Sequence, residues 1–427
     1  MTKPQNPRRR PRRVFRVPPP LVQRIDAAKL PGMDLLDDEI GPARLVFWQA
    51  FQDAELWARA EERAGLFHPG HRSERRREVE SLDPQTYEPA KPHLFLLIAL
   101  TESPTSIQAE AVRSACAELA IWFENRGLLR CAVEFAKVAS FAAPEEAPLV
   151  VRIARLLRIL GEFPRSISWF DYGYYIARRT EDWRTAAKAL TGLGILFYQR
   201  GNYPRARQYQ GRCINLARKR GLPDMAGEAF HNLFVLEMDA GNAELADTCA
   251  AKALACYPSE SGCLIRLARD LAHRWTLTGN FAASLPVQLE TLQHVTRPID
   301  RVQVWAGAGR AAAGAGEWAT FEEAWLETWH LVQAGVADPV ASIALLDLAQ
   351  GAVLLGDPHR ARYAARKALA FAQLREEGHT IFEAEALLTT LQKPGPVPPP
   401  QTEPMAFTPT LANEVIHRLK ACRAVAA

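Results

Sequence analysis

The sequence predicts an all-α protein whose main body is an α-solenoid of about seven antiparallel helix pairs, with an N-terminal helical cap and disordered tails. Its 427 residues exceed the length at which one compact core keeps growing, whereas a solenoid lengthens without becoming thicker. Glycines recur at intervals of 34 to 40 residues, a period typical of helical solenoids. We expect each of them to end the first helix of a pair. They are Gly127, Gly161, Gly201, Gly241, Gly279, Gly316 and Gly356.

Positions at fixed distances from these glycines repeat in side-chain size. The seventh residue before each glycine is small except at Phe234, and the fifth residue after it is small except at Phe321. The twelfth residue after each glycine is never large, and the eighth residue before it is apolar. Paired helices need such alternation of small and large side chains in order to pack closely. The sequence therefore predicts the same packing in each pair, with the least regular register near Phe234 and Phe321.

The chain before the solenoid has a different composition. Residues 1–33 combine the arginine run Arg8–Arg13 with proline clusters, which predicts a disordered basic tail. Residues 34–103 predict an N-terminal helical capping region, with one helix from about Pro42 to Gly65. We expect looser structure after that helix because several prolines follow it.

The remaining chain divides into three predicted segments. Residues 104–393 carry the helix pairs, and residues 394–410 form a proline-rich linker that is stiff and extended. Residues 411–427 predict a short C-terminal amphipathic helix. This helix docks on a partner or on the body of the protein itself, and the second alternative is favoured.

Composition and charge argue against several classes of protein. The formal net charge of +4 is small for this length, so it implies no general attraction to nucleic acid or anionic lipid. The longest strongly apolar run, Leu94–Leu100, is far shorter than the roughly 20 residues that span a bilayer, so no membrane span is predicted. The seven cysteines form no CxxC pair, which indicates a reducing compartment, and we expect a cytoplasmic protein.

No catalytic, metal or cofactor site is predicted. The glycine-rich stretch Gly307–Gly314 lacks the lysine and hydroxyl residue of a phosphate-binding loop, and its glycines should weaken the helix that contains them. Cys249, Cys256 and Cys263 are regularly spaced, but small buried hydrophobic residues explain them better than a metal cluster does. Nucleic acid is disfavoured as a partner, because only the arginines of the tail suggest it and a solvated tail explains them more simply.

The helix pairs resemble the tetratricopeptide repeat family. The match is best at Leu193-Gly194, Gly201-Asn202-Tyr203, Ala206 and Cys213, and the resemblance covers roughly Ser106 to Leu391. Most pairs are nearer 40 residues long than the usual 34 of that family. Pairs of this length are similar to bacterial peptide-sensing and regulatory repeat domains.

The resemblance implies a groove lined by the first helix of each pair. Acids expected in that groove are few, Glu124 and Glu228, so it would be electropositive and suit an acidic or carboxylate-ended peptide. Ordinary solvated helix charge is the alternative explanation. The residues that the family's groove positions select are Arg155, Arg158, Lys188, Tyr198, His231, Arg266, Arg269, His273 and Arg310.

These observations predict a non-enzymatic scaffold or adaptor that binds a partner peptide or protein in the groove. One alternative is a regulatory sensor of a signalling peptide, and another is the accessory subunit of an enzyme. The sequence leaves the identity of the partner and the oligomeric state open.

Overall fold

The structure is a computed structural model that describes residues 32–67, 72–258, 262–335, 340–375, 377–393 and 409–426. Every regular element within these ranges is a helix, as the sequence predicts. The chain forms two compact units, Met1–Met225 and Ala226–Ala427. The predicted tail with its arginine run and most of the proline-rich linker lie outside the described residues.

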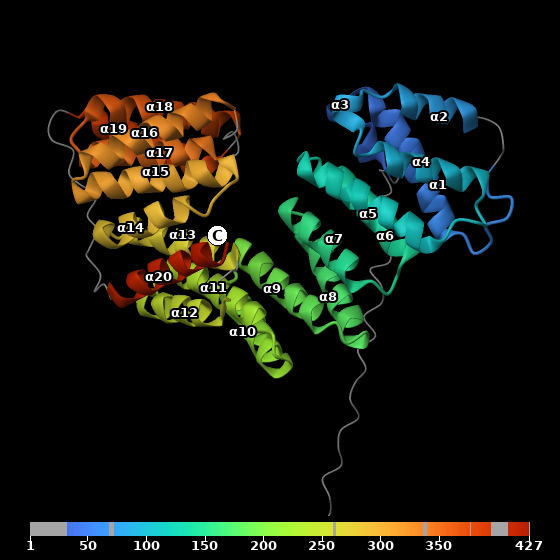
Figure 1. Cartoon of the computed structure of the whole chain (residues 1–427), viewed down its shortest axis with the longest axis horizontal. Coiled ribbons are helices and arrows are strands. Elements are labelled where there is room, and N and C mark those ends of the chain that lie inside the picture. Colours follow the sequence, from blue (N-terminus) through green and yellow to red (C-terminus); the bar gives the residue numbers. More distant parts are fainter. Residues whose placement is uncertain are drawn as a thin grey trace, which may run out of the picture. The chain divides into compact units, whose positions relative to one another are not determined.

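Seven helix pairs follow one another along the chain, and Figure 1 shows their order by colour. The first helices of the pairs are α5 (Ala109–Asn125), α7 (Ala147–Ile159), α9 (Trp183–Gln199), α11 (Pro223–Asp239), α13 (Gly262–Leu277), α15 (Pro298–Ala315) and α17 (Ala341–Leu354). The second helices are α6 (Leu129–Ala142), α8 (Phe163–Arg179), α10 (Tyr203–Arg220), α12 (Ala243–Cys256), α14 (Phe281–Leu292), α16 (Trp318–Gln333) and α18 (Pro358–Leu374). A further helix, α19 (Gly378–Gln392), packs against α18 and α17.

The seven glycines that mark the period all lie in the turn between the two helices of a pair. Their φ angles run from 69° to 78°, the left-handed region that glycine enters without steric penalty. The first helix of each pair ends just before its glycine, and the second helix, which runs in the opposite direction, begins within a few residues after it. The expectation that glycine closes each first helix is therefore confirmed.

The columns of small residues are buried in every pair. The hydroxyls of Ser166 and Ser284, both five residues after a turn glycine, donate 2.7 Å hydrogen bonds to the carbonyls of Ala154 and Ala272 in the facing helices. Phe321 occupies the same column and is fully buried. Room for its ring comes from Gly351 in the first helix of the next pair, since a Cβ added there would lie 3.1 Å from the ring. The irregular position is thus matched by a compensating glycine.

The N-terminal region is more helical than the sequence indicated. The expected long helix is shorter, α1 (Arg44–Arg59), and follows two short 3-10 helices, Met33–Leu36 and Asp38–Ala43. The expectation of looser structure after it is wrong, because three more helices follow: α2 (Arg72–Ser81), α3 (Pro84–Tyr87) and α4 (Lys91–Glu102).

Prolines begin two of these helices instead of interrupting them. Pro84 and Pro92 lie in first turns, where the missing amide hydrogen has no helical partner to lose, and the side chain of Asp83 accepts hydrogen bonds from the first turn of α3. Helix α1 packs against α4 and α6, so this region covers the first helix pair. Trp57 anchors it through a 2.7 Å hydrogen bond from its indole nitrogen to the carbonyl of Pro104.

The glycine-rich helix α15 is uninterrupted from Pro298 to Ala315, although its glycines have low helix propensity. Its glycines permit close approach by neighbouring side chains. A Cβ on Gly314 would come within 2.4 Å of the Phe281 ring, and one on Gly309 within 3.0 Å of Leu348. Tertiary packing therefore offsets the low helix propensity of these residues.

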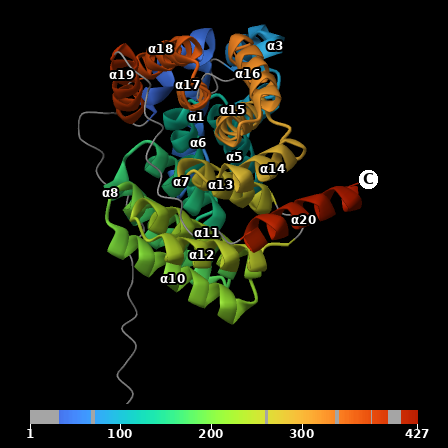
Figure 2. The same ribbon diagram turned by 90° about the vertical axis from the view of Figure 1, so that its left-hand side faces the viewer.

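The last helix, α20 (Pro409–Ala426), packs beside α14 and α13 within the second compact unit (Figures 1 and 2). Val415 and Leu419 are completely buried in this contact. The guanidinium of Arg418 donates to the carbonyls of Leu254 and Tyr257, which end α12. Among the described helices, none combines the length and the apolar character that crossing a bilayer requires.

Candidate functional site

Polar side chains join each first helix to the first helix of the next pair. In the first compact unit, Glu124 of α5 binds Arg152 and Arg155 of α7, and Arg158 of α7 donates a 2.9 Å hydrogen bond to Gln199 of α9. In the second unit the same role falls to pairs between α11 and α13, α13 and α15, and α15 and α17. Within each unit, these contacts lie along the surface made by the first helices, which we call the first-helix face.

The first-helix face of the first unit is cationic at α7 and α9. Neither helix contains an acidic residue. Their charged side chains are Arg152, Arg155, Arg158, Arg184 and Lys188. Acids reach this face from neighbouring helices, where Glu124 binds two of the arginines and Asp224 binds Arg184.

Arg158 and Lys188 are the cations of this face that have no acidic partner among the described residues. Burial lowers the pKa of Arg158, and the neighbouring charge of Arg155 lowers it further. Its Nε atom is buried and makes no hydrogen bond to a described residue. Lys188 is exposed, and the described residues offer it no ion pair. A carboxylate on this surface would pair with the exposed ammonium group of Lys188 and lie near the partly exposed guanidinium of Arg158.

The first-helix face of the second unit has its cations neutralised by aspartates. The imidazole of His231 lies 2.9 Å from Asp270, and the guanidinium of Arg310 donates to Asp347 at 3.0 Å. Arg269 bonds Asp270 at 3.3 Å. Burial raises the pKa of Asp270, but the bond and charge of His231, together with Arg269, outweigh this and hold that pKa below its usual value.

These paired residues surround a hollow of about 180 Å³. It lies among α13, α15 and α17, and α14 contributes one buried side chain, Gln288. The hollow is lined by Arg269, Asp270, His273, Gln288, Gln303, Gly307, Ile343, Ala344 and Asp347.

The structure corrects the expected charge of the groove in the second unit. The sequence interpretation counted Glu124 and Glu228 as the acids of the whole groove, but α13, α15 and α17 each contribute one aspartate: Asp270, Asp300 and Asp347. These acids were missed because face assignment on a helix depends on register. A usable signal exists, since His231 and Asp270 are 39 residues apart and Arg310 and Asp347 are 37 apart, close to one period.

The remaining groove candidates are placed separately. Tyr198 stacks on Tyr203 at the start of α10, with ring centroids 6.0 Å apart. Arg266 is exposed and bonds the sulfur of Cys263 at 3.0 Å, and it is not among the residues that line the hollow. His273 is exposed and does line the hollow. Of the groove candidates, Arg269 and His273 thus line the hollow together. His231 and Arg310 do not line it but bind the lining residues Asp270 and Asp347.

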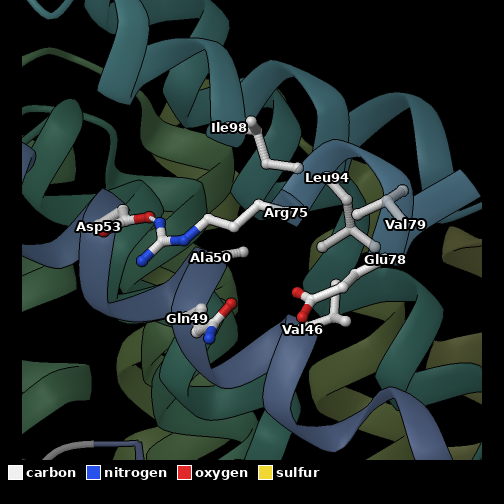
Figure 3. Close-up of a pocket in the computed structure, with 9 residues that line it drawn as sticks. All are labelled: Val46, Gln49, Ala50, Asp53, Arg75, Glu78, Val79, Leu94 and Ile98. Atoms are coloured by element: carbon white, nitrogen blue, oxygen red, sulfur yellow. Dashed lines mark hydrogen bonds and ion pairs between the residues drawn. The ribbon is translucent and has the colours of Figure 1, made fainter. Parts of the chain in front are cut away.

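A second pocket lies within the N-terminal region and is much smaller. Figure 3 shows Arg75 of α2 beside Asp53 of α1, with Glu78 and apolar side chains around them. Burial raises the pKa of Asp53, and the charge of Arg75 opposes that shift. The pocket volume is about 10 Å³, the space of a single water molecule. It is a packing defect around an ion pair and offers no room for a ligand.

Metal-binding arrangements are not found among the described residues, where no three histidine, cysteine or acidic side chains converge. All seven cysteines are free thiols, and Cys116 and Cys249 are buried. Burial raises the pKa of Cys249, so its thiol stays protonated and packs as an apolar group.

Stacked helix pairs with a recurring polar face define the class of helical repeat proteins. The family model of the tetratricopeptide repeat matches residues 145–219, which contain α7, α8, α9 and nearly all of α10. Residues 145–219 are therefore similar to tetratricopeptide repeats, which are generally protein-protein interaction modules. The matched segment includes the cationic face at α7 and α9.

Several solved structures are similar to this chain at low identity. BtubC (BKLC) from P. vanneervenii is 16% identical, with 60% of this chain and 91% of that chain covered and a TM-score of 0.33. The TPR2AB domain of yeast Sti1, in a complex with pHSP90, is 13% identical, with 66% and 100% covered and a TM-score of 0.28. A chain of the APC/C Cut9-Hcn1 hetero-tetramer is 11% identical, with 83% and 64% covered and a TM-score of 0.44. Function does not transfer at these levels, and no curated protein matches the sequence.

Proposed function

We propose that the protein is a non-enzymatic scaffold or adaptor that binds a partner peptide or protein on its first-helix face, in a reducing, cytoplasmic compartment. The cationic surface at α7 and α9 carries this proposal, because it combines five basic residues with no acid of its own helices. It lies in the segment that matches the tetratricopeptide repeat. The partner segment that fits there is acidic or ends in a carboxylate, since no acid in the described part of the chain pairs with Arg158 or Lys188.

The proposal is tested with peptide pools and a charge-reversed chain. Pools of fluorescent nine-residue peptides with net charges of about −3, 0 and +3 are offered to the immobilised full-length protein. We expect the acidic pool to be retained most strongly. The double variant Arg158→Glu and Lys188→Glu should reduce its retention at least ~tenfold, because two charge-assisted contacts of about 1.5 kcal/mol or more are replaced by repulsion.

A matched control is Lys219→Glu, which places the same change on an exposed lysine of α10, a second helix. This variant should retain the acidic pool as well as the wild type does. Equal losses in the control and the double variant would show only a general charge effect and would contradict binding at the first-helix face. Hydrogen exchange of α7 and α9 confirms that each variant is folded.

A further inference from the structure

The hollow in the second compact unit contains a buried amide that packing alone does not explain. Its volume of about 180 Å³ is many times the ~10–15 Å³ that one water molecule needs by this measure. Gln288 lines it and is only 1% exposed, yet its Oε1 atom makes no hydrogen bond to any residue that the structure describes. A buried polar group without a partner destabilises a fold.

The repeat itself provides a comparison for Gln288. It is the ninth residue after a turn glycine, and Phe170 holds the same place in an earlier pair. Each of the two side chains covers a glycine of the next first helix. A Cβ on Gly307 would come within 2.6 Å of the Gln288 amide, and one on Gly192 within 2.3 Å of the Phe170 ring. Gln210 holds the same place in another pair, is also 1% exposed and likewise has an unsatisfied Oε1 atom, so the feature that sets Gln288 apart is the hollow that it lines.

The charges around the hollow are already paired. Asp347 accepts from Arg310, Asp270 binds His231, and Arg269 donates at 3.2 Å to Gln303. A ligand carboxylate would approach two aspartates, and a ligand ammonium group would approach Arg269. The atom that remains unsatisfied is the carbonyl Oε1 of Gln288, part of a neutral carboxamide that also carries N–H donors.

The complementary ligand is another carboxamide. Two amides can exchange a pair of hydrogen bonds, each supplying one N–H and one C=O. Ile343 and Ala344 supply an apolar wall against which the methylene groups of such a side chain would pack. We propose that this hollow binds an asparagine or glutamine side chain of a partner segment, an inference that rests on the proposed peptide-binding function.

The test uses peptide pools that differ at one fixed position. Nine-residue peptides are randomised except at the centre, which is Gln, Asn, Glu, Lys or Leu, and retention by the immobilised full-length chain is measured. We expect the Gln and Asn pools to be retained at least ~fivefold more than the Glu, Lys and Leu pools.

Two substitutions should abolish that preference. Gln288→Leu removes the amide and puts an apolar side chain at this repeat position, where an earlier pair has the apolar Phe170. Gly307→Ala brings a Cβ against the Gln288 amide and displaces it from the hollow. Both variants should retain the Gln and Asn pools no more strongly than the Leu pool, which is the uncharged control of the set.

Matched controls lie in the first compact unit. Gln210→Leu changes the same residue type at the same repeat position, and Gly211→Ala adds a Cβ where no atom lies within 4 Å. Both controls should retain the preference of the wild type.

The possible results separate the two proposals. If acidic pools bind but the central carboxamide gives no preference, the inference about the hollow is wrong and the proposed function stands. Persistence of the preference in Gln288→Leu also overturns the inference. If the wild type retains none of the pools, whether fixed at the centre or selected by charge, both proposals fail.

Discussion

The two compact units use the same helical repeat to build first-helix faces of different charge. In the first unit, α7 and α9 carry five basic residues and no acid. In the second unit, α13, α15 and α17 each carry one aspartate, and these bind Arg269, His231 and Arg310. A single packing scheme therefore leaves the solvent-facing positions free to differ between units.

This difference in charge pairing suggests that the polar residues of the second unit contribute mainly to stability and those of the first unit mainly to binding. The Arg310–Asp347 pair of the second unit joins two buried side chains, 10% and 12% exposed, where a lost partner leaves a charge that water cannot reach. Most cations of the first unit are partly exposed, so they cost little to leave unpaired and remain available to a ligand. We expect substitutions in the second unit to change the stability more, and substitutions in the first unit to change the charge preference more.

The largest expected effect is that of Asp347→Ala. Arg310 is 8% exposed, and removal of Asp347 leaves its charge buried without a partner. The free energy of unfolding of the second unit should fall by about 3–5 kcal/mol. Hydrogen exchange of α15 and α17, compared with that of α7, measures the loss within the full-length chain.

Replacing the whole pair is the control for this prediction. Arg310→Met combined with Asp347→Leu should be close to the wild type in stability, since an apolar pair substitutes well for a buried ion pair. If the double variant is as unstable as Asp347→Ala, the loss of stability comes from side-chain packing and not from an unpaired charge. The proposed difference in charge pairing between the two units would then have less support.

The same comparison shows what the sequence could predict. The turn glycines and the columns of small residues recur with the period of the repeat. The turn conformation and the close packing of each pair depend on these residues locally, so the sequence was enough to predict the turns and the packing. The pairing of His231 with Asp270 depends on register between helices 39 residues apart, which no single helix reveals. Gln288 was missed for a related reason, because its significance appears only in the hollow that it lines.

The N-terminal region illustrates a different limit. Proline was interpreted there as a helix breaker, but Pro84 and Pro92 begin helices. The two roles differ by the position of proline relative to the first turn, and Asp83 ahead of Pro84 is the local signal for a helix start.

The second prediction concerns pH. The pKa of Asp270 is lowered in the folded state, so its carboxylate stabilises the fold above the unfolded pKa of about 4 and this contribution is lost as pH falls through the lowered value. Asp270→Asn should therefore cost about 1.5–3 kcal/mol at pH 7, the range for hydrogen bonds to a charged group. The cost should be unchanged at pH 5 and should shrink below about pH 4.

Hydrogen exchange of α13, referenced at each pH to the unfolded chain, measures this profile. A cost that stays constant down to pH 3 would mean that the charge of Asp270 does not stabilise the second unit. The carboxylate would then act only as a hydrogen-bond acceptor that asparagine replaces poorly.

The smallest effect on stability, and the most informative effect on binding, is expected for Glu124→Gln in the first unit. Glu124 is the acid that binds both Arg152 and Arg155, and its pKa is lowered because these arginines outweigh the effect of burial. Since the pairs are partly exposed, the free energy of unfolding should fall by less than about 1 kcal/mol. Retention of acidic peptides should increase several-fold, because two more guanidinium groups become available on the same face.

Glu162→Gln is the matched control, because Glu162 also binds two arginines, Arg130 and Arg165, and its side chain is 24% exposed against 20% for Glu124. It lies at the start of the second helix α8. Both variants add the same net charge to the protein, so a general electrostatic effect would increase retention equally in the two. An increase confined to Glu124→Gln would place the acidic partner on the first-helix face, whereas equal increases would remove the reason for assigning it there.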